Sequence, residues 1–184
     1  PQLDVIVRGE ITQYDVKVLE RAALKGVFAD VVEHSVSYVN APLLATERGM
    51  EVRLTTSSES PDYRNMTTVR GVLADGTVVS VSGTVSGPRL VEKVVEVNGF
   101  ELDVTVAEHM LFLRYNDRPG VVGQLGGILG TAGINIGGMQ VARNAKGGEA
   151  LVALTVDSAV PANLVEEISA AIGATAAHHV ALES

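Results

Sequence analysis

The sequence predicts an α+β protein made of two modules, a mixed α/β module with an antiparallel sheet followed by a βαββαβ module. Hydrophobic residues make up 46% and charged residues 20% of the 184 positions, so the chain can bury a core. A chain of this length forms one or two domains. Helical stripes alternate with strand-like stretches in both halves. Aromatic residues are only 4%, without Trp, so Val, Leu, Ile and Ala must form the core.

The first module, residues 1–106, begins with a strand and a helix and ends as an antiparallel meander. Its first strand alternates in polarity, and its first helix carries an apolar stripe at helical spacing. Pro42 suits the first turn of a second helix, and Gly49 follows its end. Asp75-Gly76 between two apolar stretches predicts a hairpin. The expected elements are a strand at Leu3–Val7, helices at Tyr14–Val27 and Tyr38–Arg48, and strands at Glu51–Thr55, Met66–Leu73, Val78–Val85, Arg89–Val97 and Phe100–Val104.

The second module, residues 107–184, is predicted to fold as a βαββαβ unit. Two apolar stripes at helical spacing, one from Val121 and one from Leu164, predict its helices, and Pro161 suits the start of the second. The expected elements are strands at Met110–Tyr115, Asn135–Arg143, Glu149–Val156 and Thr175–Leu182, with helices at 121–132 and Pro161–Ile172. This order is the ferredoxin-like split unit.

Composition argues against several classes of function. The formal net charge of −8 would repel a polyanion, so we expect no nucleic-acid partner. The absence of cysteine excludes a disulfide scaffold, a thiol nucleophile and a Cys-ligated metal, and it suits the reducing cytoplasm, where we expect the protein. No apolar run approaches the roughly 20 residues that span a bilayer, so we expect no membrane contact. The chain opens at Pro1 without Met or a signal-peptide pattern, as a processed product or a fragment of a longer protein would.

The junction between the first strand and the first helix of the second module is the strongest candidate for a ligand site. We expect Tyr115, Asp117, Gly120, Val121 and Asn135 to cluster there. Asp117 can accept from an ammonium, Asn135 offers an acceptor and two donors, and the helix-start N–H groups suit a carboxylate. A free amino acid carries both charges. The structural alternative is that Asp117 caps the helix, worth about 1 kcal/mol, and that Asn135 bonds turn backbone.

The helix after this junction contains four glycines, at positions 123, 126, 127 and 130. Each costs roughly 0.5–1 kcal/mol relative to alanine. Either close packing against another surface compensates for this loss of helix stability, or the helix is only marginally stable and its apolar face keeps it folded.

Two stretches resemble known families. Arg118-Pro119-Gly120-Val121, the helix after it and Gly133-Ile134-Asn135-Ile136 look like an ACT domain, a family of amino-acid-sensing modules, over roughly residues 109–184. The stretch from Tyr38 to Gly49, which contains Asn40-Ala41-Pro42, resembles the intervening domain of long-form D-3-phosphoglycerate dehydrogenases. The two resemblances together cover nearly the whole chain.

The resemblance implies the regulatory C-terminal part of an NAD-dependent oxidoreductase of L-serine biosynthesis. Its catalytic and nucleotide-binding domains would precede Pro1, so we expect no catalytic residue and no cofactor in this chain; no Gly-x-Gly-x-x-Gly turn follows a strand here. The resemblance further implies a homo-oligomer joined through both modules, with L-serine bound at a two-fold interface between ACT domains as feedback inhibitor. By position, Tyr115, Asp117 and Asn135 match the effector-contacting residues of the family.

Some relatives also hold an anion in the intervening domain, and Lys93 is the one residue that we carry over to such a site; a solvated strand lysine is the alternative. We expect no metal site, because His178 and His179 are adjacent on a strand and point to opposite faces. Two other functions stay open. The β portion of iron–sulfur L-serine dehydratase resembles this pair of modules, and the chain could also be an assembly domain that binds no ligand.

Overall fold

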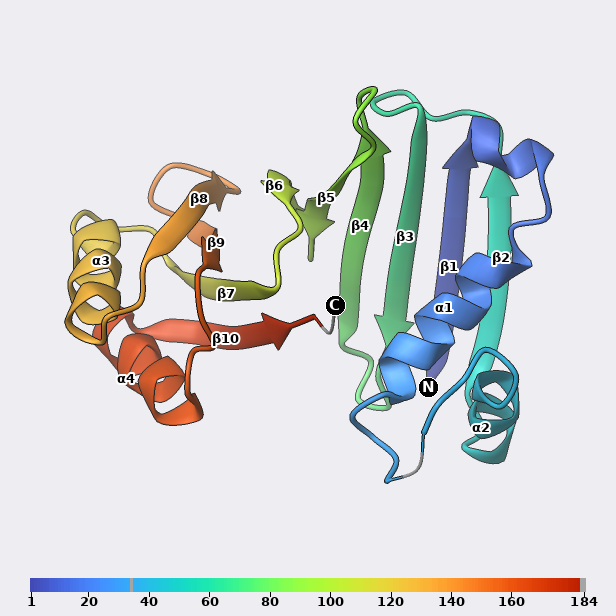
Figure 1. Cartoon of the computed structure of the whole chain (residues 1–184), viewed down its shortest axis with the longest axis horizontal. Coiled ribbons are helices and arrows are strands. Elements are labelled where there is room, and N and C mark those ends of the chain that lie inside the picture. Colours follow the sequence, from blue (N-terminus) through green and yellow to red (C-terminus); the bar gives the residue numbers. More distant parts are fainter. Residues whose placement is uncertain (34, 183–184) are drawn as a thin grey trace. The chain divides into compact units, whose positions relative to one another are not determined.

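The computed structural model describes residues 1–33 and 35–182. The chain divides into two compact units, Pro1–Gly99 and Phe100–Ser184. Both are mixtures of helices and mostly antiparallel strands (Figure 1), so the predicted α+β class is confirmed. None of the helices in the described ranges is long and apolar enough to cross a membrane.

In the first unit, two helices lie across a mixed sheet. The elements are β1 (Gln2–Gly9), the short 3-10 helix η1 (Glu10–Gln13), α1 (Lys17–Phe28), α2 (Ala41–Glu47), β2 (Glu51–Ser57), β3 (Asn65–Val72), β4 (Val78–Ser86) and β5 (Val91–Val97). The strands lie in the order β2-β1-β3-β4-β5, with β1 parallel to β2 and antiparallel to β3. The hairpin predicted at Asp75-Gly76 joins β3 to β4.

Strict alternation along β1 places the core of this unit. Leu3, Val5 and Val7 are buried on the face that α1 and α2 cover, where Leu3 packs with Leu24 and Phe28. On the opposite face, β1 carries the polar residues Gln2, Asp4 and Arg8 together with Ile6. There Arg70 of β3 donates to Asp4 of β1 at 2.9 Å.

The second predicted helix is shorter than expected. The sequence predicts Tyr38–Arg48, whereas α2 begins at Ala41. The Asn40 amide explains the difference, because its Oδ1 accepts from the Ser37 N–H at 2.7 Å and its Nδ2 donates to the Ser35 carbonyl at 3.0 Å. These bonds hold the preceding residues in a turn that competes with the helix.

The second unit contains the predicted βαββαβ order, preceded by one more strand. Its elements are β6 (Phe100–Thr105), β7 (His109–Asn116), α3 (Val121–Thr131), β8 (Ile136–Arg143), β9 (Glu149–Val156), α4 (Ala162–Ile172) and β10 (Ala174–Ala181). Four strands form a sheet in the order β10-β7-β9-β8. Both helices pack on one face of this sheet, over a core that includes Leu113, Leu125, Leu154 and Ile168.

Strand β6 belongs to this second unit by its contacts. The sequence analysis places residues 100–104 in the first module and the boundary after residue 106, whereas the compact units meet between Gly99 and Phe100. Strand β6 lies against β8 and β9, and the Asp103 N–H donates to the Gln140 side chain at 2.7 Å. An alternating stretch shows that a strand forms, but not which elements it packs against.

The glycines of α3 face away from the core. Val121, Leu125 and Leu129 are buried, and a methyl group added at Gly123, Gly126, Gly127 or Gly130 would meet no other atom within 4 Å in the described chain. The apolar face therefore holds this helix. The glycines pack against none of the other described residues, so no such contact compensates for the helix stability that they cost.

We predict that Gly126→Ala raises the free energy of unfolding by about 0.5–1 kcal/mol, since the site is open and helical. Chemical denaturation followed by circular dichroism would measure it. Gly120→Ala is the matched control. It must destabilise the protein, because Gly120 has φ +92°. A loss of stability in Gly126→Ala would show that the surface beside it is occupied.

Two imidazoles stack at one end of the second sheet. The rings of His109 (β7) and His179 (β10) lie 5.4 Å apart between centroids, and the Val160 N–H points at His179 Nε2 from 3.5 Å. Burial lowers the pKa of His179, and the neighbouring His109 lowers it further. The folded state therefore favours the neutral form of His179. The neighbouring His178 is exposed.

This depressed pKa predicts a loss of stability in acid. The unfolded chain takes up the proton near pH 6.5, before the folded chain does, so the contribution of His179 is present above that pH and is lost as the pH falls through the folded pKa. His179→Gln should flatten the dependence of the unfolding free energy on pH between about 7.5 and 5.5. His178→Gln should leave it as in the wild type. Equal slopes in all three proteins would contradict the assignment.

Candidate functional site

The turn from β7 into α3 builds the candidate site. Strand β7 ends at Asn116, and the Asp117 N–H donates to the Gly148 carbonyl at 2.8 Å, which ties this turn to the β8–β9 turn. Gly120 then occupies the N-cap position in the left-handed region, at φ +92°. A side chain there would be strained, so glycine is required for this entry into the helix. Val121, 1% exposed, anchors the first turn in the core.

Arg118 of this turn has a structural task. Its Nη2 donates to the carbonyls of Ile172 at 3.1 Å and Ala171 at 3.4 Å, at the C-terminal end of α4. Carbonyls there lack partners within their own helix, and the negative end of the helix dipole favours a cation. Arg118 thus fastens the β7–α3 turn to α4 and does not extend into the candidate site.

Arg143, which the sequence analysis did not single out, lies at this junction too. The last residue of β8, it pairs with Ala150 of β9, and Ala150 pairs on its other side with Tyr115 of β7. These three residues form one row across the sheet, on the face that the helices cover. Arg143 Nη1 contacts Asp117 Oδ2 at 3.3 Å. In the βαββαβ unit β8 runs parallel to β7, and that topology was the signal that could have found Arg143.

Tyr115 places a hydroxyl at this junction. The residue is 2% exposed, and within the described ranges no hydrogen bond is formed by its phenol oxygen. Burial raises the pKa of Tyr115, and the Asp117 carboxylate raises it further, while Arg143 opposes the shift. The oxygen itself is reached by solvent, so this hydroxyl can bond water or an external partner.

The expectation that Asn135 joins this cluster is wrong within one chain. Ile136, which follows it, pairs with Val156, and Val156 pairs with His109 at the beginning of β7. Asn135 therefore lies at the opposite end of the sheet from Tyr115. The eight residues of β8 separate the two ends by roughly 25 Å at about 3.3 Å per residue. The parallel course of β7 and β8 is the cause.

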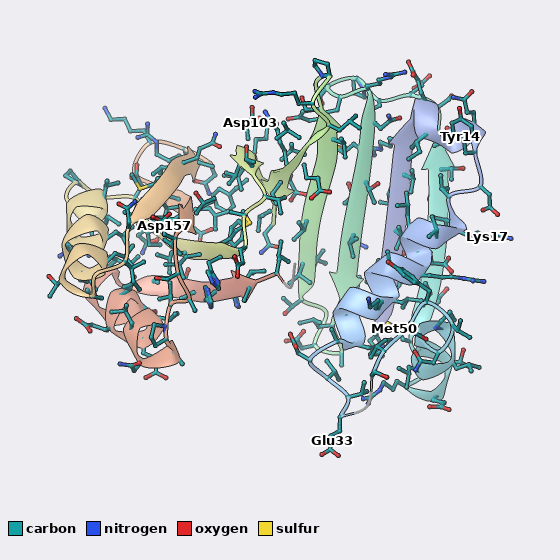
Figure 2. The ribbon with its side chains drawn as sticks, viewed as in Figure 1. Tyr14, Lys17, Glu33, Met50, Asp103 and Asp157 are labelled. Atoms are coloured by element: carbon teal, nitrogen blue, oxygen red, sulfur yellow. The ribbon has the colours of Figure 1, made fainter. Side chains whose placement is uncertain are left out.

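Asn135 has its own partner at that end. Its Nδ2 donates to Asp157 Oδ2 at 2.9 Å, and its carbonyl accepts from the Asp157 N–H at 3.1 Å. Asp157 follows β9 (Figure 2). Within one chain, Asn135 therefore closes the end of the β8–β9 pair.

The chemistry of the β7–α3 junction suits a zwitterion. The Asp117 carboxylate is 19% exposed and can accept from an ammonium. The first N–H groups of α3 lack partners within the helix and lie at the positive end of its dipole, where a carboxylate is favoured. The Tyr115 hydroxyl can donate or accept. Asp117, Tyr115, Gly120 and Val121 all lie at this junction, and their role with a ligand stays a prediction.

The remaining predicted positions lie elsewhere. Lys93 is on β5 of the first unit, opposite Thr84 of β4, and its role with an anion stays a prediction. Residues 1–33 and 35–182 contain no group of three or more His, Cys, Asp or Glu side chains that could hold a metal ion.

Comparisons with known proteins identify both units. The family model described as the D-3-phosphoglycerate dehydrogenase intervening domain matches residues 1–98, and the ACT domain model matches residues 109–173. A D-3-phosphoglycerate dehydrogenase of Mycobacterium leprae is 45% identical over 172 residues, which cover 94% of this chain and 33% of the relative. That of Bacillus subtilis is 34% identical over 171 residues, 92% of this chain and 32% of the relative.

This chain therefore spans about a third of the length of the curated relatives that it matches. Both resemblances drawn from the sequence are confirmed. The chain belongs to the family of the D-3-phosphoglycerate dehydrogenase intervening domain, which is joined here to an ACT domain.

Proposed function

We propose that this chain is the regulatory part of an NAD-dependent D-3-phosphoglycerate dehydrogenase of L-serine biosynthesis, and that it binds L-serine as a feedback inhibitor. The relatives named D-3-phosphoglycerate dehydrogenase support the parent activity. The observation that carries the ligand is the β7–α3 junction, where the Asp117 carboxylate, the Tyr115 hydroxyl and a helix N-terminus meet. The parent enzyme would be cytoplasmic.

Each group of serine has a partner in this proposal. The ammonium binds Asp117, the carboxylate accepts from the N–H groups at the start of α3, and the side-chain hydroxyl meets Tyr115. NAD has no evident place in this chain, because no strand here runs into a Gly-x-Gly-x-x-Gly turn. We assign NAD and the catalytic residues to other domains of the parent.

A second copy of the chain would complete the site. Strand β8 is an edge strand of its sheet, and an edge is where another chain can pair. Antiparallel pairing of two β8 strands about a two-fold axis brings the beginning of one strand beside the end of the other. Asn135 of one copy would then approach the β7–α3 junction of the other. This arrangement reconciles the separation of Asn135 from Asp117 with a shared ligand.

Titration calorimetry of the chain with L-serine tests the ligand. We predict measurable binding at or below millimolar concentration, and a loss of roughly 10- to 100-fold in affinity for Asp117→Ala, since a hydrogen bond to a charged group contributes about 1.5–3 kcal/mol. Glu166→Ala is the control, because it removes an exposed carboxylate from α4 of the same unit. Folded protein without heat at millimolar serine would reject the proposal.

A mixing experiment tests the shared site. Asp117→Ala and Asn135→Ala should each abolish most serine binding alone. A mixture refolded together should recover about a quarter of the wild-type sites, because half of the dimers are mixed and each has one intact pair. Recovery of no sites, with mixed dimers demonstrated, would show that Asp117 and Asn135 of different copies do not share a site.

Two alternatives make different predictions. An assembly domain would form the same dimer, by light scattering, with and without any amino acid. A subunit of an iron–sulfur L-serine dehydratase would be encoded beside a cysteine-rich cluster domain, whereas a dehydrogenase parent would carry a dinucleotide-binding fingerprint upstream. The names of the relatives favour the dehydrogenase.

A further inference from the structure

We propose that Arg143 joins the N–H groups of α3 in binding the carboxylate of the bound amino acid, so that the Asp117–Arg143 ion pair of the free protein is exchanged for two ion pairs with the ligand. The inference rests on the proposed function and deepens it. It makes Arg143 the residue that selects zwitterions over amines at this site.

The exposed fractions of the two charged side chains fit this exchange. The Asp117 side chain is 19% exposed, whereas that of Arg143 is 56% exposed. The acid therefore lies inside the junction and the guanidinium at its mouth. A zwitterion that enters with its ammonium first reaches Asp117 and leaves its carboxylate near Arg143.

The contact between the two side chains is loose. A single nitrogen of Arg143 approaches one oxygen of Asp117, at 3.3 Å, and no further hydrogen bond of either side chain is found within the described part of the chain. A guanidinium has five N–H donors and a carboxylate accepts on both oxygens. Both groups thus keep most of their bonding capacity for a ligand.

A second ion pair of the same unit shows what a structural contact looks like here. Arg114 binds Glu149 through both carboxylate oxygens, at 2.7 Å each from Nη2, with Nε at 3.0 Å. Arg114 precedes Tyr115, so its side chain lies on the opposite face of the sheet. This pair uses the bidentate geometry that arginine favours. The Asp117–Arg143 pair does not.

Tyr115, whose hydroxyl forms no hydrogen bond within the described part of the chain, is a third polar residue at this junction. It shares a row of the sheet with Arg143, through Ala150. The Arg143 cation, the Asp117 anion and the Tyr115 hydroxyl then lie at one junction. They match, in that order, the carboxylate, the ammonium and the polar side chain of a hydroxy amino acid.

The exchange predicts selectivity by charge. A zwitterion leaves neither Asp117 nor Arg143 without a partner. An amine that lacks a carboxylate displaces Arg143 from Asp117 and offers nothing in return. Arginine suits the task because its planar fork matches a carboxylate with two parallel hydrogen bonds.

Calorimetry with two ligands tests the proposal. L-Serine carries both charges, whereas L-serinamide keeps the ammonium and lacks the carboxylate. Arg143→Ala should weaken L-serine binding by roughly 10- to 100-fold and leave L-serinamide binding no weaker than in the wild type. Arg114→Gln, the matched control, should change neither by more than about twofold. Arg143→Gln serves as a second variant if the first unfolds.

The outcomes separate the two proposals. Unchanged or tighter L-serine binding by Arg143→Ala would make Arg143 a mere counter-ion of Asp117 and would overturn the inference, while the proposed function stands. Parallel changes for serine and serinamide would overturn it as well. If the wild-type chain binds no α-amino acid in a panel, the proposed function fails and the inference falls with it.

Discussion

The parallel course of β7 and β8 on either side of β9 is the constraint on which the rest of the second unit depends. It brings the last residues of both strands to one end of the sheet, so Tyr115 and Arg143 share a row there. The same constraint sends the beginning of β8, with Asn135, to the far end. One chain therefore holds the two halves of the proposed site at opposite ends of its sheet. A two-fold axis between two copies of the chain can bring these halves together.

Around that junction, the chain assigns different tasks to neighbouring polar residues. Arg118 satisfies the carbonyls at the end of α4, and Gly120 supplies the backbone conformation that starts α3. These residues fix the turn. Asp117, whose side chain contacts only Arg143 in the described part of the chain, at 3.3 Å, remains available to bind a ligand. Sequence proximity alone does not distinguish such tasks, since Asp117 and Arg118 are adjacent and both charged.

Much of the fold could be predicted from the sequence, because apolar periodicity and turn residues report local structure. The helical stripe of α3, the hairpin at Asp75-Gly76 and the βαββαβ order all follow from such patterns. Long-range placement did not follow. The motif pattern predicts Asn135 beside Asp117, but it does not include the direction of β8, which sends Asn135 to the far end and brings Arg143 to the junction instead. The packing of β6 against β8 and β9 depends on contacts that alternation does not encode.

The glycine-rich face of α3 has a consequence for motion. Four glycines leave the backbone hydrogen bonds of this helix open to water on one side, whereas α4 contains no glycine between Ala162 and Ile172. Local opening costs least where side chains shield the amides least. Amide protons of α3 should therefore exchange with deuterium sooner than those of α4. The helix that would bind an effector's carboxylate is thus among the parts of the unit that open most readily. Binding would order this helix, and the core residues packed beneath it would be ordered with it.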